Sequence, residues 1–353
     1  DLEEEIKCLE LAIRKYPKHP LSPLLEEQVS FRLHETSQRD RRGAYFFLLL
    51  TLRHLPRLLS TEETLRLIKN LTSNWEKLPF IQPLPPSSEE ASLNFNLSIQ
   101  LAFFLSKPII LYEILQKIDK NTQEKFILLK NGLISLIEME HPKLIAYILK
   151  HQKETAPEYY LLKDSLEIAI SYESIETRLE KFFLLPQKPL NLPILCYLIK
   201  KGITQKSSHL MLPFFNKIEN EELLPFLVWA LLFAQKKKEA AALLKKIKGD
   251  PLYDFLYGCY LTMAKGEKKG LIHFQTTLAA HYPSTPTLLS HYLKGNINLE
   301  SGWIKSAFLW EKVALYKELS LYFFCLGKKG KSLEFEEKVK KEYLNAQIPL
   351  NFL

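Results

Sequence analysis

The segment Cys325–Ser332, CLGKKGKS, is where residue types and spacing come closest to a known chemistry. A phosphate-binding loop has the pattern Gly-x4-Gly-Lys-Ser/Thr after a buried strand, so that backbone N–H groups surround the phosphates. Gly330 and Lys331 match the end of that pattern, but Cys325 stands where the first glycine belongs. Glycine permits the geometry of the loop, and the preceding Leu319–Leu326 contains no β-branched residue. We therefore expect a helix and a turn here, and no nucleotide site.

The nine histidines and four cysteines form no pattern that binds a metal or activates a nucleophile. The sequence contains no HExxH, no CxxC pair and no Gly-x-Ser-x-Gly elbow. Cys8, Cys196, Cys259 and Cys325 lie at least 63 residues apart, each within an apolar helical pattern, where free cysteine behaves as a small hydrophobe. We expect no catalytic residue, no metal site, no cofactor and no disulfide framework in this chain, and cysteine usage of this kind suits a reducing cytoplasm.

The composition predicts that helices carry the whole fold. The chain has 353 residues, of which 46% are hydrophobic and 25% charged, as in ordinary globular proteins. It contains only four valines and 11 glycines, whereas strands favour β-branched residues and tight hairpins need glycine. Helical period is nearly continuous, with breakers between the helices. We predict an all-α fold, an α-solenoid of antiparallel helix pairs that is clearest at the C-terminal end.

The positive charge is concentrated in the C-terminal third. Residues 236–353 contain 19 Lys+Arg and 11 Asp+Glu, a difference of +8 that equals the net charge of the whole chain. The remaining residues are therefore neutral in sum. Such a local field favours acidic partners, although lysine is also the default exposed residue of a surface helix. Both interpretations stay open at this point.

Proline-rich stretches divide the sequence into four predicted parts. These are an N-terminal helical unit (1–77), a connection (78–88), an irregular helical region (89–193) and a region of helical repeats (194–353). The connection contains four prolines and could be a mobile linker or an ordered crossing loop. The longest apolar run, Leu223–Ala234, has twelve residues, fewer than the roughly 20 that cross a bilayer, so we expect no membrane span. The absence of an initial methionine suggests a fragment of a longer protein.

The C-terminal region contains a weak internal repeat. Four turns are each followed, five residues on, by a small or apolar residue, at Ala240, Leu271, Ala307 and Ser332. With an aromatic residue or leucine further along, this resembles the second helix of the tetratricopeptide repeat, in which the small residue lets two helices approach. Gly258 would hold the matching close-contact position of a first helix. The spacing is irregular, and residues 90–200 show no clean register.

A second resemblance rests on the N-terminal end. The opening EEEIKCLELAIRKYPKHP (Glu3–Pro20), the RLHE of Arg32–Glu35 and the apolar run Ala44–Leu55 are similar to the C-terminal part of a family of chlamydial serine/threonine protein kinases. The resemblance implies a parent transferase that uses ATP and a divalent metal and joins an N-terminal kinase domain to a long helical region. None of the kinase motifs lies in this chain, so no catalytic residue is carried over.

These observations favour a non-catalytic helical region that binds a protein or peptide partner. Counting from Gly258, the expected partner-binding side chains on the inner face are Phe255, Cys259 and Thr262. The lysines expected to rim that face are Lys236, Lys237 and Lys238, with Lys268–Lys269 and Lys328–Lys331 in neighbouring turns. An acidic peptide fits such a face, whereas stacking of nucleic-acid bases is disfavoured because aromatics at helical spacing usually form core. A catalytic domain with dispersed site residues, a structural spacer, and a plain core at these positions remain alternatives.

Overall fold

The computed structural model describes nine stretches of the chain and four single positions near its start. The stretches are 41–54, 81–85, 87–118, 124–151, 157–217, 220–250, 252–277, 292–293 and 307–346, and the single positions are Glu4, Cys8, Leu11 and Lys15. Every regular element in this part of the chain is helical: fifteen α-helices and one short 3-10 helix. The predicted all-α class is therefore confirmed for the described residues.

The chain divides into two compact units, Asp1–Leu144 and Ile145–Leu353, with the division inside α8 (Pro142–His151). The described helices of the first unit are α3 (Arg41–His54), α5 (Glu90–Phe104), α6 (Pro108–Lys117) and α7 (Lys125–Glu138). Helix α5 packs against the other three, and its buried side chains include asparagines as well as leucines. The part boundaries expected at 78–88 and after 193 stay predictions.

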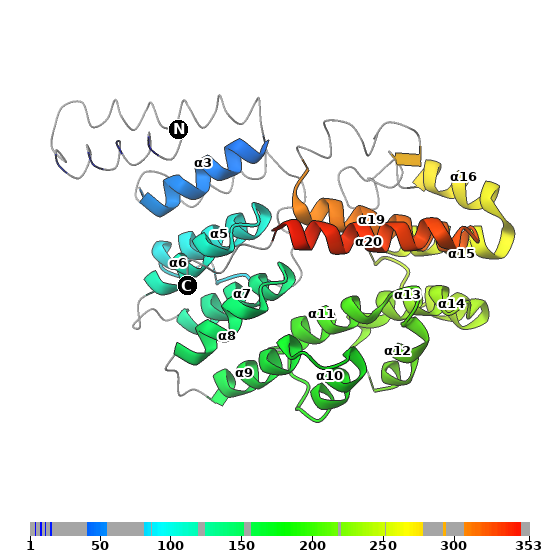
Figure 1. The fold of residues 1–353 in the computed structure, drawn as a ribbon, viewed down its shortest axis with the longest axis horizontal. Coiled ribbons are helices and arrows are strands. Elements are labelled where there is room, and N and C mark those ends of the chain that lie inside the picture. The colour runs from blue at the N-terminus through cyan, green and yellow to red at the C-terminus, as the bar shows by residue number, and fades with distance from the viewer. Residues whose placement is uncertain are drawn as a thin grey trace. The chain divides into compact units, whose positions relative to one another are not determined.

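The described part of the second unit is a succession of helices, several of which follow one another after short turns (Figure 1). In chain order they are α9 (Pro157–Ile170), α10 (Ile175–Phe182), α11 (Leu192–Gly202), α12 (Ser208–Phe215), the 3-10 helix η2 (Glu221–Leu223), α13 (Leu224–Phe233), α14 (Lys237–Leu244), α15 (Tyr253–Lys265), α16 (Glu267–Thr277), α19 (Leu309–Cys325) and α20 (Lys329–Ala346). Gly266 and Gly327 end α15 and α19 with φ of 93° and 77°, a backbone conformation that glycine adopts without strain. The following helix can then fold back after one to three residues.

Small residues lie where the paired helices touch. A Cβ added at Gly258 of α15 would be 2.3 Å from the ring of Phe274 in α16, and one added at Gly270 would be 1.8 Å from Thr262 Oγ1. In the α19–α20 pair, the buried hydroxyls of Ser320 and Ser332 lie 3.0 Å apart. Both pairs therefore place two small residues twelve positions apart in the chain at the contact between helices.

Two details of the expected repeat register are wrong. Gly270, and not Leu271, is the buried residue at the start of α16 that contacts α15. The residues that follow Ala307, expected to continue one repeat helix, and Leu319–Leu326, expected as a separate helix, instead form one helix, α19. No glycine or proline interrupts residues 309–325, so nothing ends a helix there. Ala307 is 2% exposed, as a contact residue would be, but it precedes this helix.

The helices from α13 onward share one core. Helix α19 packs against α15 and also against α13, and the buried side chains of this cluster come from both helices of each pair. In a strictly linear array each pair touches only its neighbours. The described contacts show helices packed in neighbouring pairs, and a tetratricopeptide-like solenoid stays a prediction.

A half-buried carboxylate joins α20 to the turn between α11 and α12. Glu336 Oε1 accepts a hydrogen bond from the backbone N–H of Gln205 at 2.7 Å. Burial raises the pKa of Glu336, while the Gln205 N–H and the nearby Lys340 and Lys206 act in the opposite direction. The net shift means that the folded chain holds the proton of this carboxyl more tightly than the unfolded chain does.

Replacing Gly270 with alanine is expected to destabilise the fold by about 1–3 kcal/mol, because the new methyl group would overlap Thr262 Oγ1. Gly330→Ala is the matched control: a Cβ there meets nothing within 4 Å, and alanine favours the helix by up to about 1 kcal/mol. Thermal unfolding of the two variants measures the difference. Equal stability would contradict the close approach of α15 and α16.

The raised pKa of Glu336 predicts a pH-dependent effect of Glu336→Gln. A group with a raised folded pKa contributes stability that is present below its unfolded value and lost as the pH rises through the folded one. Glutamine keeps an oxygen acceptor for the Gln205 N–H without the half-buried charge. We therefore expect the variant to be more stable than wild type at neutral pH, with the advantage fading toward and below pH 4.5, the ordinary value of this group. Chemical denaturation across that range tests it, and an advantage at every pH would contradict the assignment.

Candidate functional site

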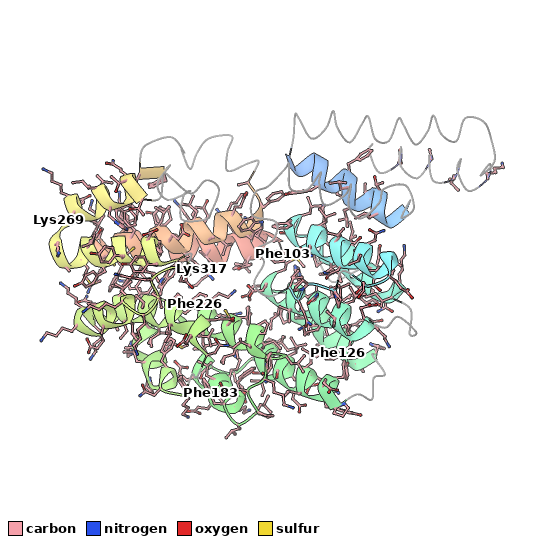
Figure 2. The ribbon with its side chains drawn as sticks, turned by 180° about the vertical axis from the view of Figure 1, so that it is seen from behind. Phe103, Phe126, Phe183, Phe226, Lys269 and Lys317 are labelled. Carbon is pink, nitrogen blue, oxygen red and sulfur yellow. The ribbon has the colours of Figure 1, made fainter. Side chains whose placement is uncertain are left out.

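The predicted rim lysines form an exposed basic surface at the starts of three helices. We use the name basic rim for this set, which comprises Lys236, Lys237, Lys238, Lys268, Lys269, Lys328, Lys329 and Lys331, all of them exposed. They occupy the first turns of α14, α16 and α20 or the residue just before them, and Lys269 projects from the end of the α15–α16 hairpin in Figure 2. Helices favour acidic residues in their first turn. Helices α14 and α16 have one each there, Glu239 and Glu267, and α20 has none. The lysines nevertheless outnumber these carboxylates at helix ends that are already positive.

Several rim lysines also have a partner within the chain. Lys237 Nζ donates to the carbonyl of Met263 at 3.0 Å, which satisfies an acceptor in the last turn of α15. Lys236 Nζ lies 3.9 Å from Glu239 Oε1 in an exposed pair. Lys329 and Lys331 lie 6.0 and 5.3 Å from the ring centroids of Phe324 and Phe323. The rim is therefore partly a stabilising feature, and Lys237 has a structural role of its own.

The residues expected to form the inner face belong to the helix core. Phe255 and Cys259 have no exposed surface, and Thr262 is 4% exposed with its hydroxyl donating to the carbonyl of Gly258 at 2.9 Å. Burial, together with a hydrogen bond to Cys325 of α19, raises the pKa of the Cys259 thiol well above its usual range. A partner cannot contact side chains that are covered by their own fold, so these three residues do not supply an apolar floor in this structure.

A row of half-buried tyrosines occupies one face of α15, at the edge of the core. Tyr253, Tyr257 and Tyr260 follow the i, i+4, i+7 spacing of one helix face, with ring centroids 5.6 and 6.2 Å apart. The ring of His273 in α16 meets Tyr257 edge-on at 5.2 Å, and His273 Nε2 lies 2.9 Å from the carbonyl oxygen of Asp254. Counting the inner face from Gly258 missed this row, although the spacing of three tyrosines was visible in the sequence.

The described residues show no arrangement for catalysis by a metal or a phosphate-binding loop. Among them, no group of three histidines, cysteines or carboxylates could hold a metal ion. The segment CLGKKGKS forms the end of α19, a turn and the start of α20, with Ser332 buried against Ser320. No helix of the described part is long and apolar enough to cross a membrane.

Comparison with known proteins shows that the chain is similar in sequence to parts of bacterial kinases. The chain is 33% identical over 370 residues to serine/threonine-protein kinase PknD of Protochlamydia amoebophila, a match that covers 99% of the chain and 37% of that protein. It is 33% identical over 103 residues to PknD of Chlamydia trachomatis serovar L2b, covering 29% of the chain and 10% of that protein. With PknD of Chlamydia muridarum the identity is 31% over 107 residues, covering 30% of the chain and 12% of that protein.

The chain thus matches a segment of PknD, and it spans a little over a third of the length of the Protochlamydia relative. No family model matches the sequence. No solved structure matches it either. The resemblance to chlamydial serine/threonine protein kinases, predicted from the opening residues, is confirmed and extends over nearly the whole chain.

The two lysines Lys237 and Lys238 should differ in their effect on stability. Each replacement by methionine removes one positive charge from the first turn of α14 and keeps an unbranched side chain. Only Lys237→Met also removes the donor to the Met263 carbonyl. We expect Lys237→Met to be less stable than Lys238→Met by roughly 0.5–1 kcal/mol in thermal or urea unfolding. If the two variants unfold alike, Lys237 does not cap α15 in solution.

Proposed function

We propose that this chain is a non-catalytic, protein-binding segment of a PknD-type serine/threonine kinase and that it recruits a partner or substrate. The support is the match to a segment of PknD along 99% of the chain, together with a described part that is all-helical and contains none of the kinase motifs. Stacked helices expose extended surfaces suited to peptides and proteins. The ATP and divalent metal of the parent kinase would then be bound outside this segment, in the cytoplasm.

The observation that carries the choice of partner is the basic rim. Eight exposed lysines lie at the starts of α14, α16 and α20, and these three helices contribute to one core. Lysine in the first turn opposes the helix macrodipole, so this placement is locally unfavourable and favours an acidic segment bound nearby. The tyrosine row of α15 offers half-exposed aromatic area of the kind that peptide-binding surfaces use. An acidic peptide is therefore the partner class proposed.

A tetratricopeptide-like arrangement of α13 to α20 belongs to the same proposal. The twelve-residue spacing between Gly258 and Gly270, repeated between Ser320 and Ser332, is the feature that supports it. In such an arrangement each pair presents its turn to one edge, which would align the lysine-containing turns. The contact of α19 with α13 indicates a tighter packing than an open superhelix.

Two alternatives make different predictions. A catalytic domain with dispersed site residues would bind ATP or transfer phosphate by itself, and we expect the purified chain to do neither. A structural spacer would bind no peptide of any charge. An array of acidic, neutral and basic peptides, probed with the purified chain at low and physiological salt, separates the spacer from the proposed recruiting segment.

Reversing two rim lysines should weaken binding of the best acidic peptide from that array. The variant is Lys268→Glu with Lys269→Glu, because both side chains are exposed and neither holds the α15 terminus as Lys237 does. The control, Lys143→Glu with Lys188→Glu, makes the same change in net charge at exposed positions outside the rim. We expect an affinity loss of about tenfold at low salt for the first variant and little for the control. An equal effect of both would mean that only net charge matters.

A further inference from the structure

The proline-rich connection is packed against its own unit where it is described. Ile81 and Leu84 are 8% and 9% exposed, whereas Gln82, Pro83 and Pro85 between and beside them are exposed. Prolines at 83 and 85 exclude a helix and favour extended backbone. Of the two interpretations left open by the sequence, residues 81–85 therefore fit the ordered crossing loop, with two apolar anchors three residues apart.

One buried side chain of α7 pairs with the backbone of this segment. Asn131 is fully buried, and its Oδ1 accepts the backbone N–H of Gln82 at 3.0 Å while its Nδ2 donates to the Gln82 carbonyl at 2.9 Å. The second N–H of Nδ2 donates to Asn96 Oδ1 of α5 at 2.9 Å, which fixes the orientation of the amide. Asn131 thus binds both the backbone N–H and the backbone carbonyl of Gln82, as a neighbouring β-strand would.

A third polar side chain, that of Lys130, binds the side chain of Gln82. Lys130 Nζ donates to Gln82 Oε1, and Lys130 is only 5% exposed, so that burial lowers its pKa. We use the name Asn131 site for Asn96, Lys130 and Asn131. Burying two amides and a lysine on neighbouring helices is costly unless their hydrogen bonds are made. A crossing loop held only by Ile81 and Leu84 would not need them.

We propose that the Asn131 site binds extended peptides of the pattern apolar–Gln–Pro–apolar–Pro and that residues 81–85 are its built-in occupant. The backbone pair made by Asn131 is independent of how the bound segment is connected to the chain. Specificity comes from the two apolar anchors, the Gln82 amide and the prolines, which hold the peptide extended before it binds. This site lies in the first unit and does not depend on the basic rim.

The built-in segment acts as a competitor for any external peptide. An intramolecular ligand has an effective concentration in the millimolar range, so a peptide of similar intrinsic affinity binds wild type only weakly. Weakening the internal segment should make the site available. Binding at the Asn131 site is then regulated by competition. A partner gains access when its proline-containing segment binds the site more tightly than residues 81–85 do.

The test uses a fluorescein-labelled peptide with the sequence of residues 80–86, FIQPLPP, and fluorescence anisotropy with the full chain. The chain variant Ile81→Ala with Leu84→Ala weakens the internal occupant, and we expect it to bind the peptide at least about tenfold more tightly than wild type does. Adding Asn131→Ala to that variant should abolish the gain. A peptide N-methylated at its glutamine lacks the donor to Asn131 and should bind about tenfold more weakly.

Hydrogen exchange of the unaltered chain provides a second measurement that does not depend on how the variants fold. Excess FIQPLPP should accelerate exchange in the proteolytic fragment that contains the Gln82 amide, and the N-methylated peptide should not. The proposal is overturned if the weakened variant, shown to be folded by circular dichroism, binds the peptide no better than wild type. It is equally overturned if the N-methylated and unmodified peptides bind alike, or if exchange at Gln82 does not respond to the peptide.

Discussion

The close approach of paired helices is the constraint on which the second unit depends. Where α15 meets α16, no side chain larger than hydrogen fits at Gly258 or Gly270, because the ring of Phe274 and the hydroxyl of Thr262 occupy the space. In the same core, the ring of Phe274 packs against Phe255 of α15 and against Tyr322 of α19. The packing of these helix pairs fixes the positions of the turns between the helices. It therefore also fixes the positions of the lysines at the starts of α14, α16 and α20.

The first unit depends on a different physical interaction. Helix α5 buries asparagine and serine side chains, and one of those amides, Asn96, orients Asn131 toward an extended segment of the chain. Ser92 also donates to Glu124 Oε2 at 2.8 Å, so the polar groups of this core are connected across helices. Apolar packing alone would have given a more stable and less selective interior. The polar interior is what enables this unit to recognise a peptide backbone.

The sequence predicted the fold class and the kinase resemblance, because scarce valine and glycine and a distinctive opening segment are properties of the chain itself. It misplaced the helix register around Ala307, since a small residue near an aromatic is found as readily before a helix as inside a helix pair. It also assigned Phe255 and Cys259 to a surface, because helical period shows which residues share a face but not which face a later helix covers. In this chain Trp229 of α13 and Phe274 of α16 pack against Phe255, and Cys325 of α19 contacts Cys259. Asn131 could not be found from sequence, because an asparagine within an apolar run has no signature until the segment it binds is in place.

The two candidate surfaces differ in the range of the forces they would use. The basic rim acts through exposed charge, which speeds encounter with an acidic partner and is screened within about 10 Å at ordinary salt. The Asn131 site acts through short hydrogen bonds from buried groups, which salt hardly screens. Raising the ionic strength should therefore weaken binding at the rim and leave binding of the proline-containing peptide nearly unchanged.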